Sequence, residues 1–318
     1  MGQYLSYSGF KTFANKESGC GFAWWLKYGR DKRAFDLGIE PENCVNTLFG
    51  DTVGNIFEAF YRDKLWKNKA QTTQVLLDLV PELFEKVCRD QVRPDRWTGK
   101  VTRVLDWDDP AANYHSPEEV LVEVREAVPR GMNIIRAYQL LGPYAEAEVK
   151  LDIKHDDDLI AGRADFIIDR IPPHNDRILL DGKGTRNPQW VDPDQLRWYG
   201  MLHRERYGKG PDRMGFLLWR FDPMDSIDWL SVSDGDLEKM YGDALMAIGR
   251  IKRGMTRLGG SQDLDDVRQV FQPRPTDDGC RFCPFARGDI CEKGAPIAKK
   301  LRDQAARNRE RKARRRCK

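Results

Sequence analysis

The spacing of apolar residues in this chain changes from a helical period to a strand period shortly after residue 141. In the first part, apolar side chains recur every three to four positions, which is the spacing of one helix face. Helices are therefore expected over the segments 6–25, 46–69, 74–90 and 118–141. A serine precedes the first helix, where it can cap the free backbone N–H groups, and Gly131 interrupts the last one. Residues 91–117, rich in aspartate, proline and tryptophan, predict an irregular link.

A strict alternation of apolar and charged residues follows this helical part. Its apolar members are Ala147, Val149, Leu151 and Ile153, and this period of two is typical of a half-buried strand. Three further strands are expected over the segments 159–169, 177–183 and 214–221. Helices are expected over the segments 193–207 and 233–257.

The connections between these segments predict how the strands pair. A short polar turn joins the first two strands, so they are expected to be antiparallel neighbours, whereas the last strand follows a helix, which allows a parallel crossover. The fold class is therefore α/β, with a mixed central sheet and a helix–three strands–helix–strand core. A helical N-terminal region and a C-terminal cysteine cluster flank this core.

The organisation along the chain indicates one domain over residues 1–298, followed by a basic tail over 299–318. Within the domain we expect a mainly helical part, a sheet core, and a region with a helix and a cysteine cluster. These three parts span residues 1–141, 142–222 and 223–298.

Charge is distributed unevenly along the 318 residues. The formal net charge is +3, but the segment from Lys299 to Lys318 alone carries 11 basic and 2 acidic residues. Such a tail favours either a polyanion such as nucleic acid or a solvated, disordered end, and the two interpretations are compatible. With no long apolar run and no leader-like N-terminus, the expected location is the cytoplasm, without membrane association.

Charged residues within two of the apolar strands are the main candidates for chemistry. Asp165 lies inside the second strand, while Asp181 and Lys183 lie two apart on the third and so point to one face. Two carboxylates can hold a hard divalent cation, which lowers the pKa of a bound water, and the lysine can orient that water. A plain salt bridge at a sheet edge is the alternative interpretation, and it is favoured when the tripeptide of residues 181–183 is considered alone.

The surroundings of these residues strengthen the catalytic interpretation. Gln195 and Tyr199 are four apart on the next helix and share a face, which is expected to lie beside the acidic residues. Glu58 on an upstream helix can add a third acid, although it also fits an ordinary exposed glutamate of an amphipathic helix. Glu148, on the preceding strand, is a weaker candidate for the edge of the site.

The motifs Gly162-Arg-Ala-Asp165, Asp181-Gly-Lys183 and Gln195-Leu-Arg-Trp-Tyr199 resemble the PD-(D/E)xK nuclease superfamily, specifically its RecB-like branch. The resemblance implies Mg²⁺ or Mn²⁺ held by Glu58, Asp165, Asp181 and the Gly182 carbonyl group. It also implies that Lys183 positions the attacking water, and that Gln195 and Tyr199 steady the DNA backbone or the catalytic residues. Many relatives have a histidine where this chain has Glu58.

Three cysteines near the C-terminus, Cys280, Cys283 and Cys291, have a spacing typical of metal ligands. The segment around Cys20 resembles that of iron–sulfur exonucleases of the CRISPR-associated and AddB type, in which one N-terminal cysteine completes a [4Fe–4S] site. The resemblance implies such a cluster on these four residues. The longer spacing before Cys291 leaves Zn²⁺ as the alternative. The other three cysteines, at positions 44, 88 and 317, are interpreted as ordinary residues.

Together with the motifs, the resemblance therefore implies a metal-dependent nuclease that acts on DNA, as a single-strand exonuclease with a structural iron–sulfur cluster. Trp24, Trp25 and Tyr28 are candidates for stacking on bases, and core packing is the competing interpretation for the two tryptophans. No phosphate-binding loop of the ATPase type is present. The alternative is a non-catalytic nucleic-acid-binding subunit of a recombination, repair or CRISPR adaptation complex, in which protein partners are expected; a phage origin is compatible with either.

Overall fold

The computed structural model describes residues 2–30, 37, 39, 41–67, 72–95, 99–141, 144–170, 174–281, 283–288 and 290–316. Cys317 lies outside this part of the chain. No helix in the described part is long and apolar enough to cross a lipid bilayer.

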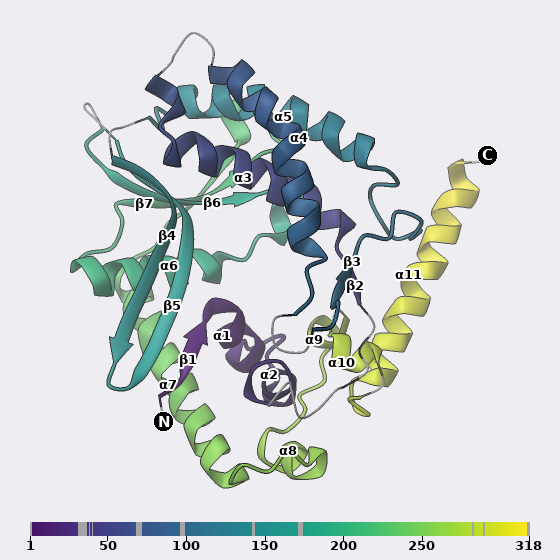
Figure 1. Cartoon of the computed structure of the whole chain (residues 1–318). Helices are drawn as coiled ribbons and strands as arrows, with labels where there is room; N and C mark the ends of the chain where they lie inside the picture. The colour runs from purple at the N-terminus through teal and green to yellow at the C-terminus, as the bar shows by residue number, and fades with distance from the viewer. Residues whose placement is uncertain are drawn as a thin grey trace.

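A six-stranded mixed sheet lies at the centre of the molecule (Figure 1). Its strands are β1 (Tyr4–Ser6), β4 (Tyr144–His155), β5 (Asp158–Asp169), β6 (Arg177–Lys183), β7 (Arg213–Leu218) and β8 (Ile227–Leu230). Their order is β1-β5-β6-β7-β8, with β4 paired to the other edge of β5. The expected pairings are confirmed: β4–β5 is antiparallel, and β6–β7 is parallel across a helix. The mixed α/β class is also confirmed, but the short strands β1 and β8 were not predicted.

Helices cover both faces of this sheet (Figure 1). One layer contains α3 (Leu48–Arg62), α4 (Thr72–Gln91) and α5 (Pro117–Ala137). The other contains α1 (Tyr7–Ala14), α2 (Gly21–Trp24), α6 (Pro193–Tyr207) and α7 (Asp234–Leu258). Each layer forms its own hydrophobic core with the sheet face beneath it. The helix α6 connects β6 to β7 and packs mainly against β4 and β5.

The first helical segment is broken where one continuous stretch was expected. Ser6 caps α1 as predicted, by accepting a hydrogen bond from the Gly9 N–H. The helix ends at Ala14 because the Asn15 side chain then accepts hydrogen bonds from the N–H groups of residues 17 and 18, which closes a turn. A π-helical turn, η1 (Trp25–Gly29), follows α2.

The next helices differ from expectation in smaller ways. The helix α3 ends at Arg62 and is followed by the 3₁₀ turn η3 (Leu65–Lys67); the predicted end at residue 69 lies outside the described residues. Gly131 does not interrupt α5. A Cβ atom there would meet the Phe57 ring at 2.2 Å, so the missing side chain lets α5 pack against α3.

The link over residues 91–117 is largely irregular, as expected. Among its described residues, only the two-residue strand β3 (Arg103–Val104) interrupts it, paired in parallel with β2 (Glu42–Asn43). Short helical turns lie in other connections: η2 (Val45–Thr47), η4 (Pro188–Trp190) and η5 (Pro223–Asp225) are 3₁₀, and α10 (Pro284–Arg287) is α-helical.

The C-terminal part contains α8 (Leu264–Val270), α9 (Asp277–Arg281) and α11 (Ala295–Arg316). Its basic end is helical rather than irregular, because α11 includes most of the tail. The first turns of α11 pack against α9 and α10, and the rest projects from the body towards the C-terminus (Figure 1).

Candidate active site

The antiparallel pairing of β5 and β6 brings Asp165 and Asp181 together. The last pair in this ladder is Phe166 with Leu180, so one further step along the same register places the two aspartates across from each other. Beyond this point, the edge of β5 pairs with β1 over residues 159–161 instead of β6. The two central strands therefore separate at the aspartates, and this opens the sheet locally.

The ribbon formed by β4 and β5 changes face at the same point. Val149, Leu151 and Ile153 pack into the core with α6 and α7, whereas Ala145 and Ala147 pack into the core with α3, α4 and α5. Glu148 lies at the change with a left-handed backbone, φ 54°, which is strained for a residue with a side chain. The alternation in the sequence predicted the strand but not this reversal.

Hydrogen bonds hold the two aspartates in this opening. The Gly182 N–H, which has no strand partner on that side, donates to Asp165 Oδ2 at 2.8 Å. Asp181 is 2% exposed, and its Oδ2 forms an ion pair with Lys183 Nζ. The predicted lysine–aspartate contact is therefore present, but beside a second buried carboxylate rather than as an isolated surface pair.

Burial of two neighbouring carboxylates raises the pKa of both. For Asp165 the pKa is raised to about 8, first by loss of solvent and then by the charge of Asp181. Loss of solvent also raises the pKa of Asp181, while Lys183 opposes the rise. Burial likewise raises the pKa of Glu148, to which the charges of Glu58 and Asp181 add. A cation placed among these acids would reverse the shifts, because it favours their charged forms.

The helix α6 supplies the polar side chains above the aspartates. Lys183 Nζ donates to Gln195 Oε1 at 3.0 Å, and Gln195 Nε2 lies 3.3 Å from Asp181 Oδ1 and 3.0 Å from the Tyr199 hydroxyl oxygen. The glutamine thus bridges the lysine, the buried aspartate and the tyrosine. Burial also raises the pKa of Tyr199, so its hydroxyl stays protonated at neutral pH.

The start of α6 is fixed by the N-terminal helix. Asp192 caps α6 by accepting from the Asp194 N–H, and it also accepts hydrogen bonds from the Tyr7 hydroxyl and the Lys11 ammonium group, both at 2.5 Å. This aspartate thereby ties α1 to the helix that carries Gln195.

Gly162 allows α6 to lie close to β5. A Cβ atom at this position would meet the Leu202 side chain at 2.6 Å and the Tyr199 ring at 3.1 Å. The glycine three residues before Asp165 therefore has a packing role, because any larger residue would push Tyr199 away from the acids.

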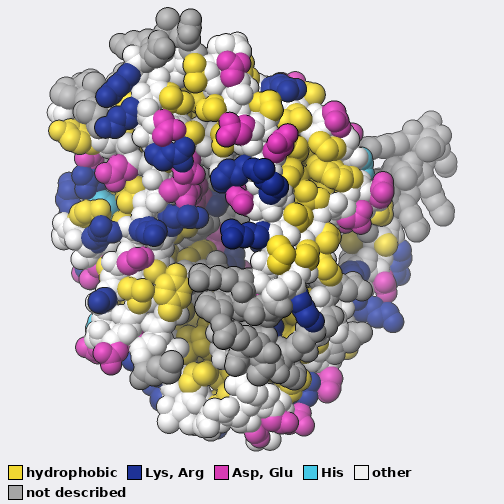
Figure 2. All heavy atoms as spheres, viewed as in Figure 1, with side chains coloured by type: hydrophobic (Ala, Val, Ile, Leu, Met, Phe, Trp, Pro, Cys, Tyr) yellow, Lys and Arg dark blue, Asp and Glu magenta, His cyan; other side chains and the backbone are white. Residues whose placement is uncertain are grey.

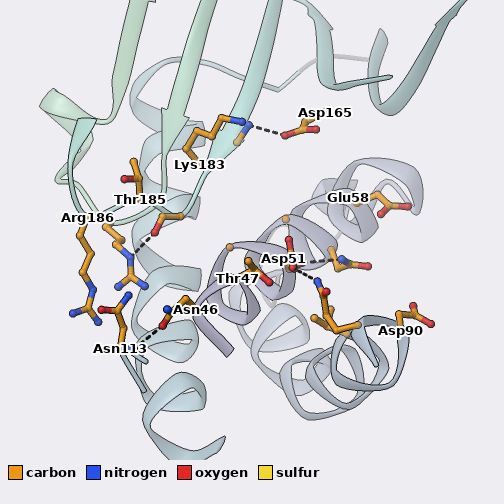
Figure 3. Close-up of a pocket in the computed structure, with 18 of the residues that line it drawn as sticks. Asn46, Thr47, Asp51, Glu58, Asp90, Asn113, Asp165, Lys183, Thr185 and Arg186 are labelled. Atoms are coloured by element: carbon orange, nitrogen blue, oxygen red, sulfur yellow. Dashed lines mark hydrogen bonds between the residues drawn. The ribbon is translucent and has the colours of Figure 1, made fainter. Parts of the chain in front are cut away.

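A cavity of about 790 Å³ opens from Asp165 and Lys183 towards α3 and α4. Figure 3 shows Asp165 and Lys183 at the strands, with Asp51 and Glu58 on the helices across the cavity. Glu58 and Glu148 line this cavity, although Glu58 forms an ion pair with Arg62 at 2.9 Å and Glu148 forms one with Arg163 at 2.6 Å.

The carboxylates at the cavity provide part of a metal site. Across the part of the chain that the structure describes, no three His, Cys, Asp or Glu side chains are grouped so as to hold a metal ion. The chemistry of the donors still fits a hard divalent cation, since the oxygen groups of Asp165 and Asp181 are adjacent and their charges are only partly compensated. The structure brings these two together, but it does not complete the predicted set with Glu58.

A second group of side chains lines the opposite wall, and no pattern in the sequence predicted this group. Arg220 donates through Nε to the Gly184 carbonyl oxygen at 2.7 Å and contacts both Glu123 and the Tyr114 hydroxyl. Arg186 pairs with the other oxygen of Glu123 at 2.7 Å. On the face shown in Figure 2, lysine and arginine side chains gather in a band beside a central hollow. The connection after β6 is therefore held by Arg220 and Arg186, which share Glu123 as an ion-pair partner.

Trp190 is the most exposed aromatic side chain on this wall. It is 76% exposed, lines the cavity, and ends the turn η4, which lies between Lys183 and Gln195 in sequence. The candidates from the sequence behave differently: Trp24 and Trp25 are buried in the core, and Tyr28 is 40% exposed. The two tryptophans therefore pack the core and are not available for stacking on bases. An exposed tryptophan in a loop has no periodic signal, so the pattern could not identify Trp190.

The four cysteines assigned to a cluster line one cavity of about 240 Å³. Cys20 Sγ accepts backbone hydrogen bonds from Ala23 and Arg274, each at 3.5 Å. A Cβ atom on Gly294 would lie 3.3 Å from the sulfur atoms of both Cys280 and Cys291, so these sulfurs are at most twice that distance apart. The segment around Cys20 thus meets the C-terminal segment of residues 280–291 here, although the described cysteines do not form a closed set of metal ligands.

The other two described cysteines lie apart from this cavity. Cys44 is buried and donates from Sγ to the Val104 carbonyl oxygen at 3.2 Å, while Cys88 is partly buried on α4. Neither lines the cavity of the four cysteines.

Comparisons with solved structures and curated proteins gave distant similarity at best. The "Putative exonuclease" from Eubacterium rectale is 14% identical, with 82% of this chain and 83% of that chain covered and a TM-score of 0.41. The protein SSO0001 is also 14% identical, with 86% and 93% covered and a TM-score of 0.26. No curated protein matched this sequence.

A family model also matched most of the sequence. The model of the PD-(D/E)XK nuclease superfamily matches residues 4–292, which include the paired aspartates, the lysine and all four cysteines. Its members hydrolyse phosphodiester bonds and generally use Mg²⁺ or Mn²⁺. Because this match covers most of the sequence, the chain belongs to the PD-(D/E)XK nuclease superfamily.

Proposed function

We propose that this chain is a metal-dependent nuclease of the RecB-like branch that degrades single-stranded DNA from an end. The observation that carries the proposal is the joint placement of Asp165, Asp181, Lys183 and Gln195 at the end of a cavity lined by both acidic and basic side chains. An ion pair with Lys183 needs only one acid, Asp181. The second buried acid, Asp165, destabilises the folded protein when no metal is bound, because it places another carboxylate away from solvent. The extra carboxylate is explained if it binds a cation.

The proposed ligands of Mg²⁺ or Mn²⁺ are Asp165, Asp181 and the Gly182 carbonyl oxygen, with Glu58 as a further acid across the cavity. When bound, the cation supplies Lewis-acid chemistry and lowers the pKa of a coordinated water. Gly182 suits this arrangement because its N–H already fixes the Asp165 carboxylate.

The remaining residues position the reactants. Lys183 has a second hydrogen-bond partner in Gln195, so its ammonium group is fixed beside Asp181 and can hold the attacking water in line with the phosphate. Gln195 keeps that orientation by contacting Asp181 at the same time. The protonated hydroxyl of Tyr199 can donate a hydrogen bond to a phosphate oxygen, because its own partner, Gln195 Nε2, is a donor.

Single-stranded DNA fits the walls of the cavity. Arg163, Arg186 and Arg220 line it and can contact phosphates, while exposed Trp190 offers a face on which an unpaired base can stack. A base inside a duplex is already stacked and paired, so Trp190 favours a strand whose bases are free. This exposed ring is the observation that supports single strands over duplex.

Variants of the catalytic strand test this function. Purified protein with Mn²⁺ or Mg²⁺ is expected to degrade single strands labelled at either end, and the label that is lost first gives the polarity. Asp181→Ala and Lys183→Ala are expected to abolish cleavage and to keep binding of the strand. Undiminished cleavage by both variants would exclude the proposed site, whereas a parent protein that only binds would indicate a non-catalytic subunit.

We further propose that Cys20, Cys280, Cys283 and Cys291 hold a structural [4Fe–4S] cluster, with Zn²⁺ as the alternative. The convergence of all four on one cavity supports this, as do the two backbone N–H groups directed at Cys20 Sγ. Hydrogen bonds to the sulfur atoms are a usual feature of such clusters.

Anaerobic purification followed by visible absorbance and metal analysis tests the cluster. A brown protein with about four irons per chain supports the proposal. A colourless protein that contains zinc supports the alternative, and a chain with neither metal would contradict both.

A further inference from the structure

A hollow between the end of α7, α8 and the turn before α2 is lined by four arginines. These are Arg250, Arg253, Arg257 and Arg274, and the lining of this cavity of about 630 Å³ contains no aspartate or glutamate. All four arginines are exposed. The hollow shares no lining residue with the catalytic cavity, and Figure 1 shows α8 and the end of α7 away from α3 and β6.

The placement of three of these arginines on α7 is unfavourable in the absence of an anion. Arg250, Arg253 and Arg257 lie at positions i, i+3 and i+7, so they share one face, and like charges at this spacing repel each other. None of the ion pairs between described residues includes them. Two lysines of the same helix do have partners: Lys239 pairs with Asp243 at 2.6 Å, and Lys252 pairs with Asp158 at 2.8 Å.

The fourth arginine comes from a segment that the fold holds in place. A Cβ atom on Gly254 would meet the Phe271 ring at 2.5 Å, so α7 and this segment are in close contact. The N–H of Arg274 donates to Cys20 Sγ at 3.5 Å, which fixes the segment from its other side. Arg274 is thereby placed across the hollow from the arginines of α7.

We propose that this arginine hollow is an accessory site for the phosphate backbone of a single-stranded nucleic acid. Positions i to i+7 extend over about 10 Å of helix axis, which is longer than one phosphate and suits a row of them. Guanidinium groups bind phosphate oxygens in a bidentate manner. The inference rests on the proposed function, since the bound strand is the one whose end enters the catalytic cavity.

Binding without cleavage tests this site. The affinity of full-length protein for a long labelled single strand is measured by fluorescence anisotropy in EDTA, over a series of salt concentrations. Arg253→Glu/Arg257→Glu is expected to weaken binding about tenfold or more and to reduce the slope against salt by about 2. Arg253→Gln/Arg257→Gln is expected to show a smaller loss of the same kind, and both are checked for an unchanged melting temperature.

A matched control is Arg125→Glu/Arg136→Glu on α5, which changes the net charge equally at exposed arginines outside both cavities. It is expected to bind as the parent does, apart from a small general effect of charge. Equal losses in the two charge-reversed proteins would overturn the accessory site. A second result would also overturn it. In that result, inorganic phosphate raises the melting temperature of the parent and of the α5 control but not of Arg253→Glu/Arg257→Glu, while all three proteins bind the strand equally. This pattern would indicate a site for a small anion.

Cleavage of short oligonucleotides separates this inference from the proposed function. Strands too short to reach the hollow are expected to be cleaved at the parental rate by Arg253→Glu/Arg257→Glu, while longer strands show a raised KM. A defect on short strands would contradict a separate anchor. If the parent cleaves nothing, the proposed function fails, and the anisotropy measurements still decide whether the hollow binds the strand.

Discussion

The carboxylate site and the cysteine site of this molecule are assembled in opposite ways. The acids and their lysine come from adjacent strands, β5 and β6, within a short stretch of sequence, and the next helix completes the group. The cysteine cavity joins Cys20 to three cysteines near the other end of the chain. The carboxylate site destabilises the fold by burying like charges. The cysteine site closes a very long loop, and bringing the ends of such a loop together costs conformational entropy. Chemistry and stability are therefore expected to depend on different residues.

The largest expected effect is on catalysis. Asp181→Asn keeps the shape of the side chain but removes a charge that Lys183 and a cation require, so cleavage is expected to fall about 10³-fold. Its melting temperature, measured in EDTA, is expected to stay at or above that of the parent, because a buried charge is removed. A clear fall in melting temperature together with the loss of cleavage would contradict the distinction between the two sites.

At the cysteines, we expect a large loss of stability and a small loss of cleavage. Cys280→Ser is expected to lower the free energy of unfolding by about 3 kcal/mol or more, as for the loss of a structural metal site, while cleavage at low temperature falls much less. Denaturant titration of the variant against Cys88→Ser measures this, since Cys88 lies outside the cavity. Equal stability of the two serine variants would show that the cysteine cavity does not hold the chain together.

A change in packing beside the active site is expected to affect both stability and cleavage. Gly162→Ala is expected to cost about 1–3 kcal/mol, because the added Cβ meets Leu202 and the Tyr199 ring, and to reduce cleavage through the displaced tyrosine. Gly242→Ala in α7 is the matched control, since its added Cβ has no neighbour within 4 Å apart from adjacent residues and the backbone of its own helix. That control is expected to be neutral or slightly stabilising. Two indistinguishable melting curves would contradict the close packing of α6 on β5.

The stability of the metal-free protein is expected to depend on pH through Asp165. Its folded pKa of about 8 lies above that of an unfolded aspartate, so the folded state binds the extra proton between about pH 4 and pH 8. The contribution of Asp165 to stability is therefore fully present below this window. As the pH rises through the window, the free energy of unfolding falls by up to about 1.4 kcal/mol per pH unit. Denaturation midpoints in EDTA are expected to show a flatter profile for Asp165→Asn. Parallel profiles for parent and variant would exclude this origin.

The smallest expected effect concerns the exposed tryptophan. Trp190→Ala is expected to raise KM for single strands about fivefold to tenfold, and Trp190→Phe is expected to restore most of the loss, since both rings can stack. Tyr144→Ala, at a residue that is 69% exposed and outside the catalytic cavity, serves as control. Equal effects on duplex and single strands would remove the argument for strand selection.

The features that sequence predicted well are those encoded by short-range pattern. The alternation around Val149 and the apolar runs after it predicted β4, β5 and β6, and the short turn predicted the antiparallel pairing of β4 with β5. The joint placement of Lys183 and Gln195 followed from strand and helix periods. These relations hold because neighbouring strands and the next helix leave little freedom for other arrangements.

Features that depend on tertiary contacts could not be predicted in this way. The pairing of β1 with the middle of the sheet joins residues about 155 positions apart, and no local period encodes it. Gly131 resembled a helix break until its contact with Phe57 was known. The burial of Trp24 and Trp25 and the exposure of Trp190 depend on which face each segment turns to the core.

The reversal at Glu148 has a consequence for how the molecule unfolds. On one side of this residue the β4–β5 ribbon belongs to the core with α6 and α7, and on the other side to the core with α3, α4 and α5. Neither core can unfold without exposing part of the β4–β5 ribbon, against which the other core packs. We therefore expect a single cooperative transition, with slow hydrogen exchange along β4 and β5, rather than stepwise loss of the two layers.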